Sequence, residues 1–160
     1  MAWSLYRNLQ ASLIDYLIGL SEDENLLDSE GNSINFYVGR KNDQSWNLNA
    51  ISVHFESQTS PRGFISSNQR LESFLMIINI FAKTEIDRLE LARWVTLSIN
   101  DGFPLYTYAY NSENPELPIK TSDGWTRVNF LTNTRVNLGQ NVSETDAHRH
   151  SISITVQLVK

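Results

Sequence analysis

The sequence predicts an α+β domain in which two helices pack on one face of a mainly antiparallel sheet. Three observations lead to this prediction. Residues 74–82 form a short apolar run, broken only by Asn79, that favours a strand over a helix. Residues 3–20 and 84–99 instead carry apolar residues at helical spacing. Several other segments alternate apolar and polar residues, as half-buried strands do.

Length and composition indicate one globular domain over residues 1–160. The chain is 41% apolar and 19% charged, and it contains no cysteine, so disulfides and thiolate metal sites are excluded. A formal charge of −5 disfavours a protein that grips nucleic-acid backbone, although it does not prevent DNA from passing close by. No signal peptide is recognised, and no apolar run approaches the roughly 18 residues of a membrane span.

The first helix is predicted over residues 3–20, with Ser4 as its N-cap and Gly19 near its end. Its apolar stripe consists of Leu5, Leu9, Leu13 and Leu17, widened by Ile14, Ile18 and Leu20. The polar residues that follow, up to Ser33, are predicted to be a loop.

Two strands are predicted next, over residues 34–40 and 50–57. In the second, Ile51 and its apolar neighbours at every other position point inward, and His54 is expected to be a solvated histidine on the outer face. A loop carrying Trp46 connects the two strands.

Residues 57–70 form a long polar segment centred on Pro61, Arg62 and Gly63. Loops of this length without structure are uncommon in compact domains and usually bind something or extend a hairpin. Phe64 and Ile65 are expected to be exposed apolar residues at its tip. The segment is therefore predicted to be an arm that grips a neighbouring molecule.

The strand over residues 74–82 is apolar on both faces and must be covered on both. We expect both helices to share one face, which leaves the other to the arm or to a neighbour. Thr84 and Asp87 resemble a capping box at the start of the second helix. Arg88 falls within the apolar arc of that helix and is interpreted as a snorkelling side chain.

The C-terminal third adds three strands. Residues 103–110 are aromatic and extended, and Pro104 favours an edge strand. Residues 111–124 are predicted to be a loop, followed by strands over 125–138 and 151–159.

No catalytic constellation is found, so the protein is predicted not to be an enzyme and to need no metal or cofactor. His148 and His150 would share one face of a strand, but the only other histidine, His54, lies on a different strand. There is no Gly-x-Ser-x-Gly, His-Glu-x-x-His or phosphate-binding loop. Arg127 and Arg135, near the aromatic Trp125, are interpreted as subunit contacts rather than a nucleic-acid face, because acidic residues are interleaved with them.

The order of elements, together with the stretch FLMIINIFAKTEIDRLELARW and the closing strand SISITVQLV, resembles the tail-terminator and tail-completion proteins of long-tailed bacteriophages. The resemblance spans nearly the whole chain. The chain departs from that family in having longer segments at 57–70 and 111–124. A related role in the phage neck is therefore kept as an alternative.

The resemblance implies a structural virion protein that forms a ring, in that family usually a hexamer. Such a ring caps the tail tube and docks the capsid connector while the genome passes through its lumen without specific binding. The expected location is the virion, and the host cytoplasm during assembly. An alternative from another class is a monomeric ligand-binding module that uses the aromatic 103–110 strand. The candidate interface residues are Trp46, Pro61, Arg62, Phe64, Ile65, Arg127 and Arg135.

Overall fold

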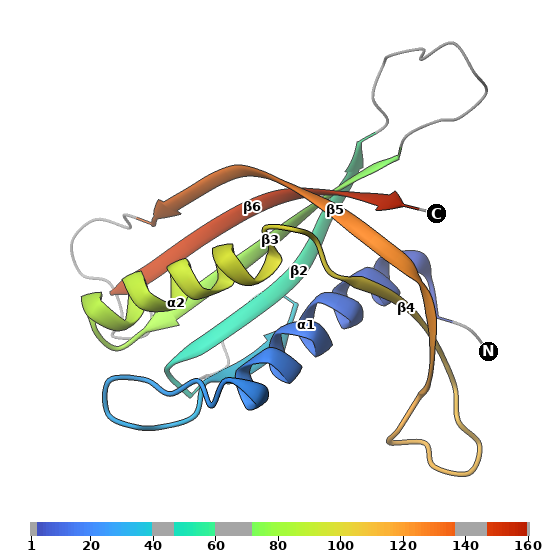
Figure 1. Ribbon diagram of the computed structural model, residues 1–160, viewed down its shortest axis with the longest axis horizontal. Coiled ribbons are helices and arrows are strands. Elements are labelled where there is room, and N and C mark those ends of the chain that lie inside the picture. Colours follow the sequence, from blue (N-terminus) through green and yellow to red (C-terminus); the bar gives the residue numbers. More distant parts are fainter. Residues whose placement is uncertain (1–2, 40–46, 60–71, 137–146, 160) are drawn as a thin grey trace.

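The computed structural model describes residues 3–39, 47–59, 72–136 and 147–159, which form two helices and six strands (Figure 1). The elements in chain order are α1 (Leu5–Asp23), β1 (Asn35–Val38), β2 (Ala50–Thr59), β3 (Ser73–Ala82), α2 (Glu85–Ile99), β4 (Pro104–Ala109), β5 (Ile119–Arg135) and β6 (His148–Val159). The predicted α+β class is confirmed.

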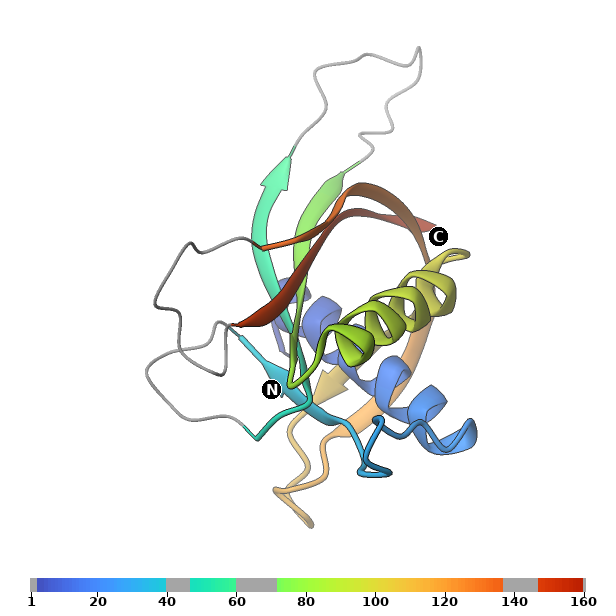
Figure 2. The same ribbon diagram turned by 90° about the vertical axis from the view of Figure 1, so that its left-hand side faces the viewer.

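The strands form one sheet in the order β1-β2-β3-β6-β5-β4, so the apolar strand β3 lies near its centre. Of the strands described, β1 and β2 pair in parallel, and the other neighbouring pairs are antiparallel. The sheet curls around the two helices (Figure 2).

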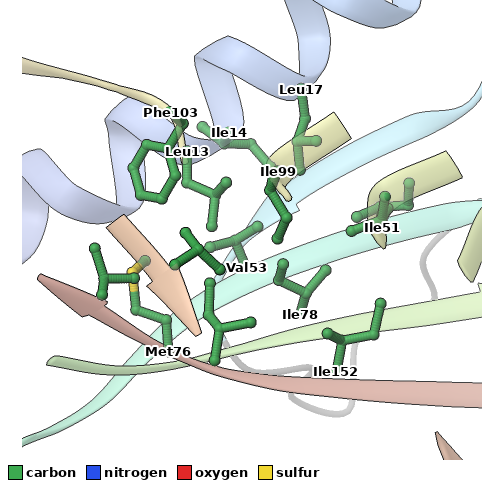
Figure 3. Close-up of a cluster of buried hydrophobic side chains, with 14 of the residues drawn as sticks. Leu13, Ile14, Leu17, Ile51, Val53, Met76, Ile78, Ile99, Phe103 and Ile152 are labelled. Carbon is green, nitrogen blue, oxygen red and sulfur yellow. The ribbon is translucent and has the colours of Figure 1, made fainter. Parts of the chain in front are cut away.

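Both helices pack on the same face of the sheet, as expected, and a single core lies between them and the strands (Figure 3). The helix-facing residues of β3 are completely buried and meet leucines of α1 and the buried face of α2. The central members of this core are Leu13, Leu17, Val53, Met76, Ile78, Val95, Ile99 and Ile152.

The opposite face of the sheet is not covered by either helix. On β3 this outer face carries Leu75 and Ile77, which are half-buried, and on β6 it carries polar residues such as Ser153 and Thr155. His54 also lies on this face, but the prediction that it is solvated was wrong. Its ring is buried beside Ile77, with Nε2 3.3 Å from the carboxylate of Glu56.

Helix α1 begins as predicted, because the Ser4 side chain accepts a hydrogen bond from the backbone N–H of Arg7. Its end was predicted too early. The helix continues through Gly19 and ends at Asp23, where the N–H of the C-cap residue Glu24 donates to the carbonyl of Leu20. Residues 21–23 are therefore helical rather than loop.

Two polar segments that were predicted to be loops are partly strand. Residues 57–59 continue β2 and pair with β3, and the rest of the predicted arm, 60–70, lies outside the described residues. Residues 119–124 begin β5 and pair with β4. In both cases the backbone hydrogen bonds of a neighbouring strand outweigh the turn-like composition.

Gly102 makes the turn from α2 into β4. Its φ is +89°, and a Cβ at this position would lie 1.9 Å from the carbonyl oxygen of Thr126. The Thr126 hydroxyl in turn accepts from the N–H of Phe103 and donates to its carbonyl. Only glycine fits this close approach of two backbones.

Candidate assembly surfaces

The candidate interface residues predicted from the sequence are not brought together. Trp46, Pro61, Arg62, Phe64 and Ile65 lie outside the described residues. Arg127 and Arg135 are both exposed on β5, but they point to opposite faces of the sheet. Arg127 is the cross-strand neighbour of Gln157, on the outer face. Arg135 is the cross-strand neighbour of His150, on the helix-covered face.

Helix α2 carries an exposed apolar stripe on the side that faces away from the sheet. Ile86, Leu89 and Leu97 are 63%, 53% and 65% exposed, and Arg93 lies between them. These four residues, at successive turns, are called the α2 surface below. The sequence contained the signal, because a helical wheel puts these aliphatic residues opposite the buried face that contains Leu91 and Val95. Exposed apolar residues grouped in this way indicate an interaction site.

A polar network centred on the buried side chains of Arg88 and His150 holds α2 against β5 and β6. Arg88 forms an ion pair with Glu85 and donates to Nδ1 of His150 at 2.6 Å. The other ring nitrogen of His150 therefore carries the proton and donates to Asn133 Oδ1. Asn133 continues the chain with a 3.0 Å bond to the hydroxyl of Thr96 on α2.

This network corrects the interpretation of Arg88, which is buried in ion-pair and hydrogen-bond contacts rather than snorkelling. Hydrogen bonds from Arg88 lower the pKa of Glu85 to about 2. Burial and the neighbouring Arg88 guanidinium lower the pKa of His150. The two histidines singled out in the sequence do share a face, but His148 contacts Glu85, and the two ring nitrogens of His150 are engaged by Arg88 and Asn133.

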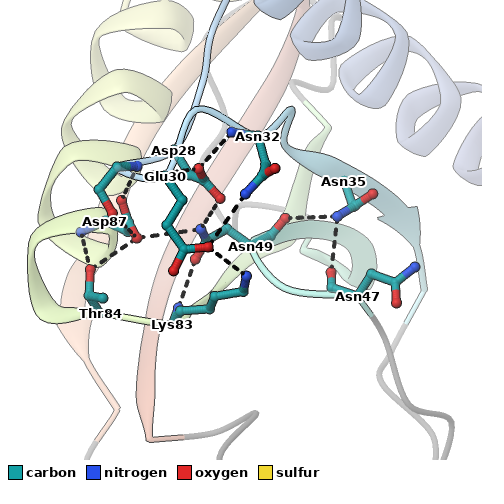
Figure 4. Close-up of polar contacts among 10 residues, drawn as sticks. Asp28, Glu30, Asn32, Asn35, Asn47, Asn49, Lys83, Thr84 and Asp87 are labelled. Atoms are coloured by element: carbon teal, nitrogen blue, oxygen red, sulfur yellow. Dashed lines mark hydrogen bonds and ion pairs between the residues drawn. The ribbon is translucent and has the colours of Figure 1, made fainter.

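A second polar cluster fixes the start of α2 (Figure 4). Thr84 caps the helix as predicted, accepting from the N–H of Asp87 at 3.1 Å. The Asp87 carboxylate is buried and accepts from the Ser29 N–H and hydroxyl, the Thr84 hydroxyl and the Asn49 amide. It therefore ties the loop after α1 to α2, in addition to its position in the predicted capping box. Asn49 also donates to Asp28 and accepts from the N–H of Lys83.

The hairpin formed by β4 and β5 projects from the body of the molecule, away from α2 (Figures 1 and 2). Its end, residues 110–119, is called the hairpin tip. Tyr110, Leu117 and Ile119 are 57%, 64% and 53% exposed there. Glu113 and Glu116 are also exposed, and neither forms an ion pair with any residue that the structure describes. The sequence prediction treated this region as a plain loop and missed it as a surface.

The hairpin tip has an internally fixed conformation. The Asn111 side chain accepts from the N–H groups of Glu113 and Asn114, and its amide donates to the carbonyl of Leu117 at 3.0 Å. The N–H of Leu117 donates to the carbonyl of Asn114. Such side-chain bonds to local backbone define tight turns, and the side chain of Leu117 is largely exposed on this turn.

The base of the hairpin is fixed to α1. The hydroxyl of Tyr108 donates to Asp15 at 2.6 Å, and Lys120 lies 3.5 Å from the same carboxylate and over the ring of Tyr106. Burial and the bond to Asp15 raise the pKa of Tyr108. These contacts join both strands of the hairpin to the body of the molecule at its base.

Helix α1 also closes the free edge of β4. The buried hydroxyl of Ser12 accepts from the N–H of Tyr106 at 2.9 Å and donates to its carbonyl, and Asn8 accepts from the N–H of Tyr108. An edge strand whose polar groups are satisfied in this way cannot easily add another strand. Assembly through the β4 edge of the sheet is therefore disfavoured.

The aromatic 103–110 segment, on which the alternative hypothesis of a ligand-binding module rests, is partly buried and partly exposed. Phe103, Leu105 and Tyr108 are buried, and Tyr108 stacks on Trp3 at 5.1 Å between ring centroids. Trp125 is partly exposed, but its indole N–H donates to the carbonyl of Asp101. Within the described ranges, no group of three or more His, Asp or Glu side chains is arranged to hold a metal ion.

No protein-family model matches the sequence, and none of the curated proteins matches it significantly. Neither α1 nor α2 is both long and apolar enough to span a membrane.

Proposed function

We propose that this protein is a ring-forming structural subunit at the head–tail junction of a long-tailed bacteriophage. In this role it caps the tail tube and docks it to the capsid connector, and the genome passes through the lumen without specific binding. Its partners are other copies of itself, the tail tube protein and the connector proteins. The proposal places it in the virion, and in the host cytoplasm during assembly.

The observation that carries the proposal is the pair of exposed apolar surfaces on rigid elements. The α2 surface and the hairpin tip each expose three large apolar side chains, and each is fixed by buried or local hydrogen bonds. A group of exposed apolar residues is unfavourable in a protein that stays monomeric, because its apolar surface remains in water. Such groups are typical of surfaces that become buried in an assembly.

The element order that resembles the tail-terminator family supports the same function. The described polar clusters also support a structural role, because their side chains are used in holding loops and helices. The groups around Asp87 bond to backbone and to one another, and the groups around His150 join α2 to the sheet. These observations fit another neck or tail structural protein equally well, and that role is the second candidate.

Electron microscopy of the purified protein mixed with tail tubes tests the proposal. We expect a ring of density at one end of each tube, and tubes that no longer grow when tube subunits are added. Native mass spectrometry of the same sample should give oligomers of one defined size. A protein that stays monomeric and never decorates tube ends would refute the proposal.

A further inference from the structure

We infer that the hairpin tip of one copy docks on the α2 surface of the next copy, so that copies join head to tail. This inference rests on the proposed ring function and identifies the contact that would build the ring. The molecule that occupies each α2 surface is a second copy of this chain.

The two surfaces do not meet within one molecule. The hairpin projects beyond α1, while the α2 surface faces away from the sheet on another side of the molecule (Figures 1 and 2). The loop after α1 and the polar network with β5 and β6 fix the position of α2. Neither surface can therefore satisfy the other inside the same chain.

The two surfaces are chemically complementary. The α2 surface combines Ile86, Leu89 and Leu97 with the cation of Arg93. The hairpin tip combines Tyr110, Leu117 and Ile119 with the anions of Glu113 and Glu116. Lys120, the cation nearest the tip in sequence, is already paired with Asp15. Glu90 is exposed near Arg93 and partly offsets its charge, so the apolar residues carry the contact and the charges orient it.

The two surfaces are also rigid, which reduces the entropy lost on docking. The three bonds made by Asn111 hold the tip, and Tyr108 and Lys120 fix its base to α1. The α2 surface lies on a regular helix capped by Thr84. Docking therefore requires no described element to change its conformation.

The symmetry of such a contact agrees with a ring. Because the tip and the α2 surface are different patches, their contact is heterologous, and repeated heterologous contacts either close into a ring or grow into a filament. Pairing of two α2 surfaces would instead give an isolated twofold dimer. The geometry of the products therefore separates the inference from its main competitor.

Thiol cross-linking tests the contact directly, because the chain contains no cysteine. We would prepare Leu117→Cys, carrying a size tag, and Leu97→Cys, and treat their mixture with a short bismaleimide in the presence and absence of tail tubes. Both sites are exposed, so the variants should melt within a degree or two of the wild type. The control pair is Leu117→Cys with Asn129→Cys, which places the second thiol at an exposed site on the outer face of β5, the face of the sheet that carries neither helix.

The expected result is a mixed dimer in at least tenfold excess over the control pair. A protein carrying both Leu117→Cys and Leu97→Cys should give a ladder that ends at the ring size. Homodimers of Leu97→Cys as the main product would overturn the inference in favour of pairing between α2 surfaces. Wild-type rings without the mixed product would overturn it while leaving the proposed function in place.

A charge exchange provides a second, independent measurement. Arg93→Glu should weaken self-association about tenfold, and combining it with Glu113→Lys and Glu116→Lys should restore most of the loss. No weakening by Arg93→Glu in a protein that assembles would count against the contact. If the wild type neither assembles nor decorates tubes, the proposed function itself fails, and this result is distinct from both outcomes above.

Discussion

The carboxylate of Asp87 offers the most direct test of how the α2 surface is held in place. It is buried and accepts hydrogen bonds from Ser29, Thr84 and Asn49. The change Asp87→Ala removes this acceptor and leaves the donors of a buried cluster without their common partner. The loop after α1 and the first turn of α2, which contains Ile86, should both loosen.

The size of the effect follows from the bonds that are lost. Three of them are 2.9–3.0 Å long, and a hydrogen bond to a charged group contributes about 1.5–3 kcal/mol. The contributions do not add fully, because water can enter and replace part of the loss. We therefore expect Asp87→Ala to reduce the free energy of unfolding by about 3 kcal/mol. For a chain of this size, this corresponds to a fall of about 6–12 °C in melting temperature.

Urea unfolding followed by circular dichroism measures the loss, with Asp123→Ala as the matched control. Asp123 is exposed, so its replacement should change the free energy of unfolding by less than about 0.5 kcal/mol. A double-mutant cycle with Ser29→Ala should show coupling of about 1 kcal/mol or more. Equal losses for Asp87→Ala and the control, or no coupling with Ser29, would refute this account of how α2 is anchored.

Three further predictions follow from the fold. Gly102→Ala forces a Cβ to 1.9 Å from the carbonyl oxygen of Thr126 at a φ of +89°. Chemical denaturation should therefore show a free energy of unfolding that is lower by about 2 kcal/mol or more. The control Gly19→Ala should not destabilise α1, because no atom lies within 4 Å of the added Cβ. His150 has a lowered pKa in the folded state, so the unfolded chain binds the proton more readily. Stability should therefore fall as the pH drops below about 6.5. The equilibrium constant for unfolding should rise at most tenfold per pH unit. The melting temperature of His150→Gln should vary less with pH between 5 and 7, and an unchanged slope would contradict the assignment. Ser12→Ala leaves the N–H and carbonyl of Tyr106 without their partner, and should cost about 1–3 kcal/mol and increase aggregation measured by light scattering.

Local patterns in the sequence were sufficient for the elements whose hydrophobic period is regular. The cap at Ser4, the buried stripe of α1, the two-sided apolar strand β3 and the alternation in β6 were all found where expected. These features depend on neighbours within a few residues, so spacing alone reports them. The placement of both helices on one face also followed from the sequence, because two amphipathic helices and one sheet have few ways to bury their apolar sides.

The tertiary structure decided what depends on residues far apart in the chain. Residues 119–124 are polar and turn-like, yet they form a strand because β4 offers them hydrogen-bonding partners. Arg88 and His54 looked solvated because they pack beside His150 and Ile77, residues of other strands that no local pattern connects to them. The exposure of the α2 surface and of the hairpin tip also depends on the tertiary structure. Periodicity identifies which side of a helix is apolar, but only packing shows which apolar residues remain without a partner.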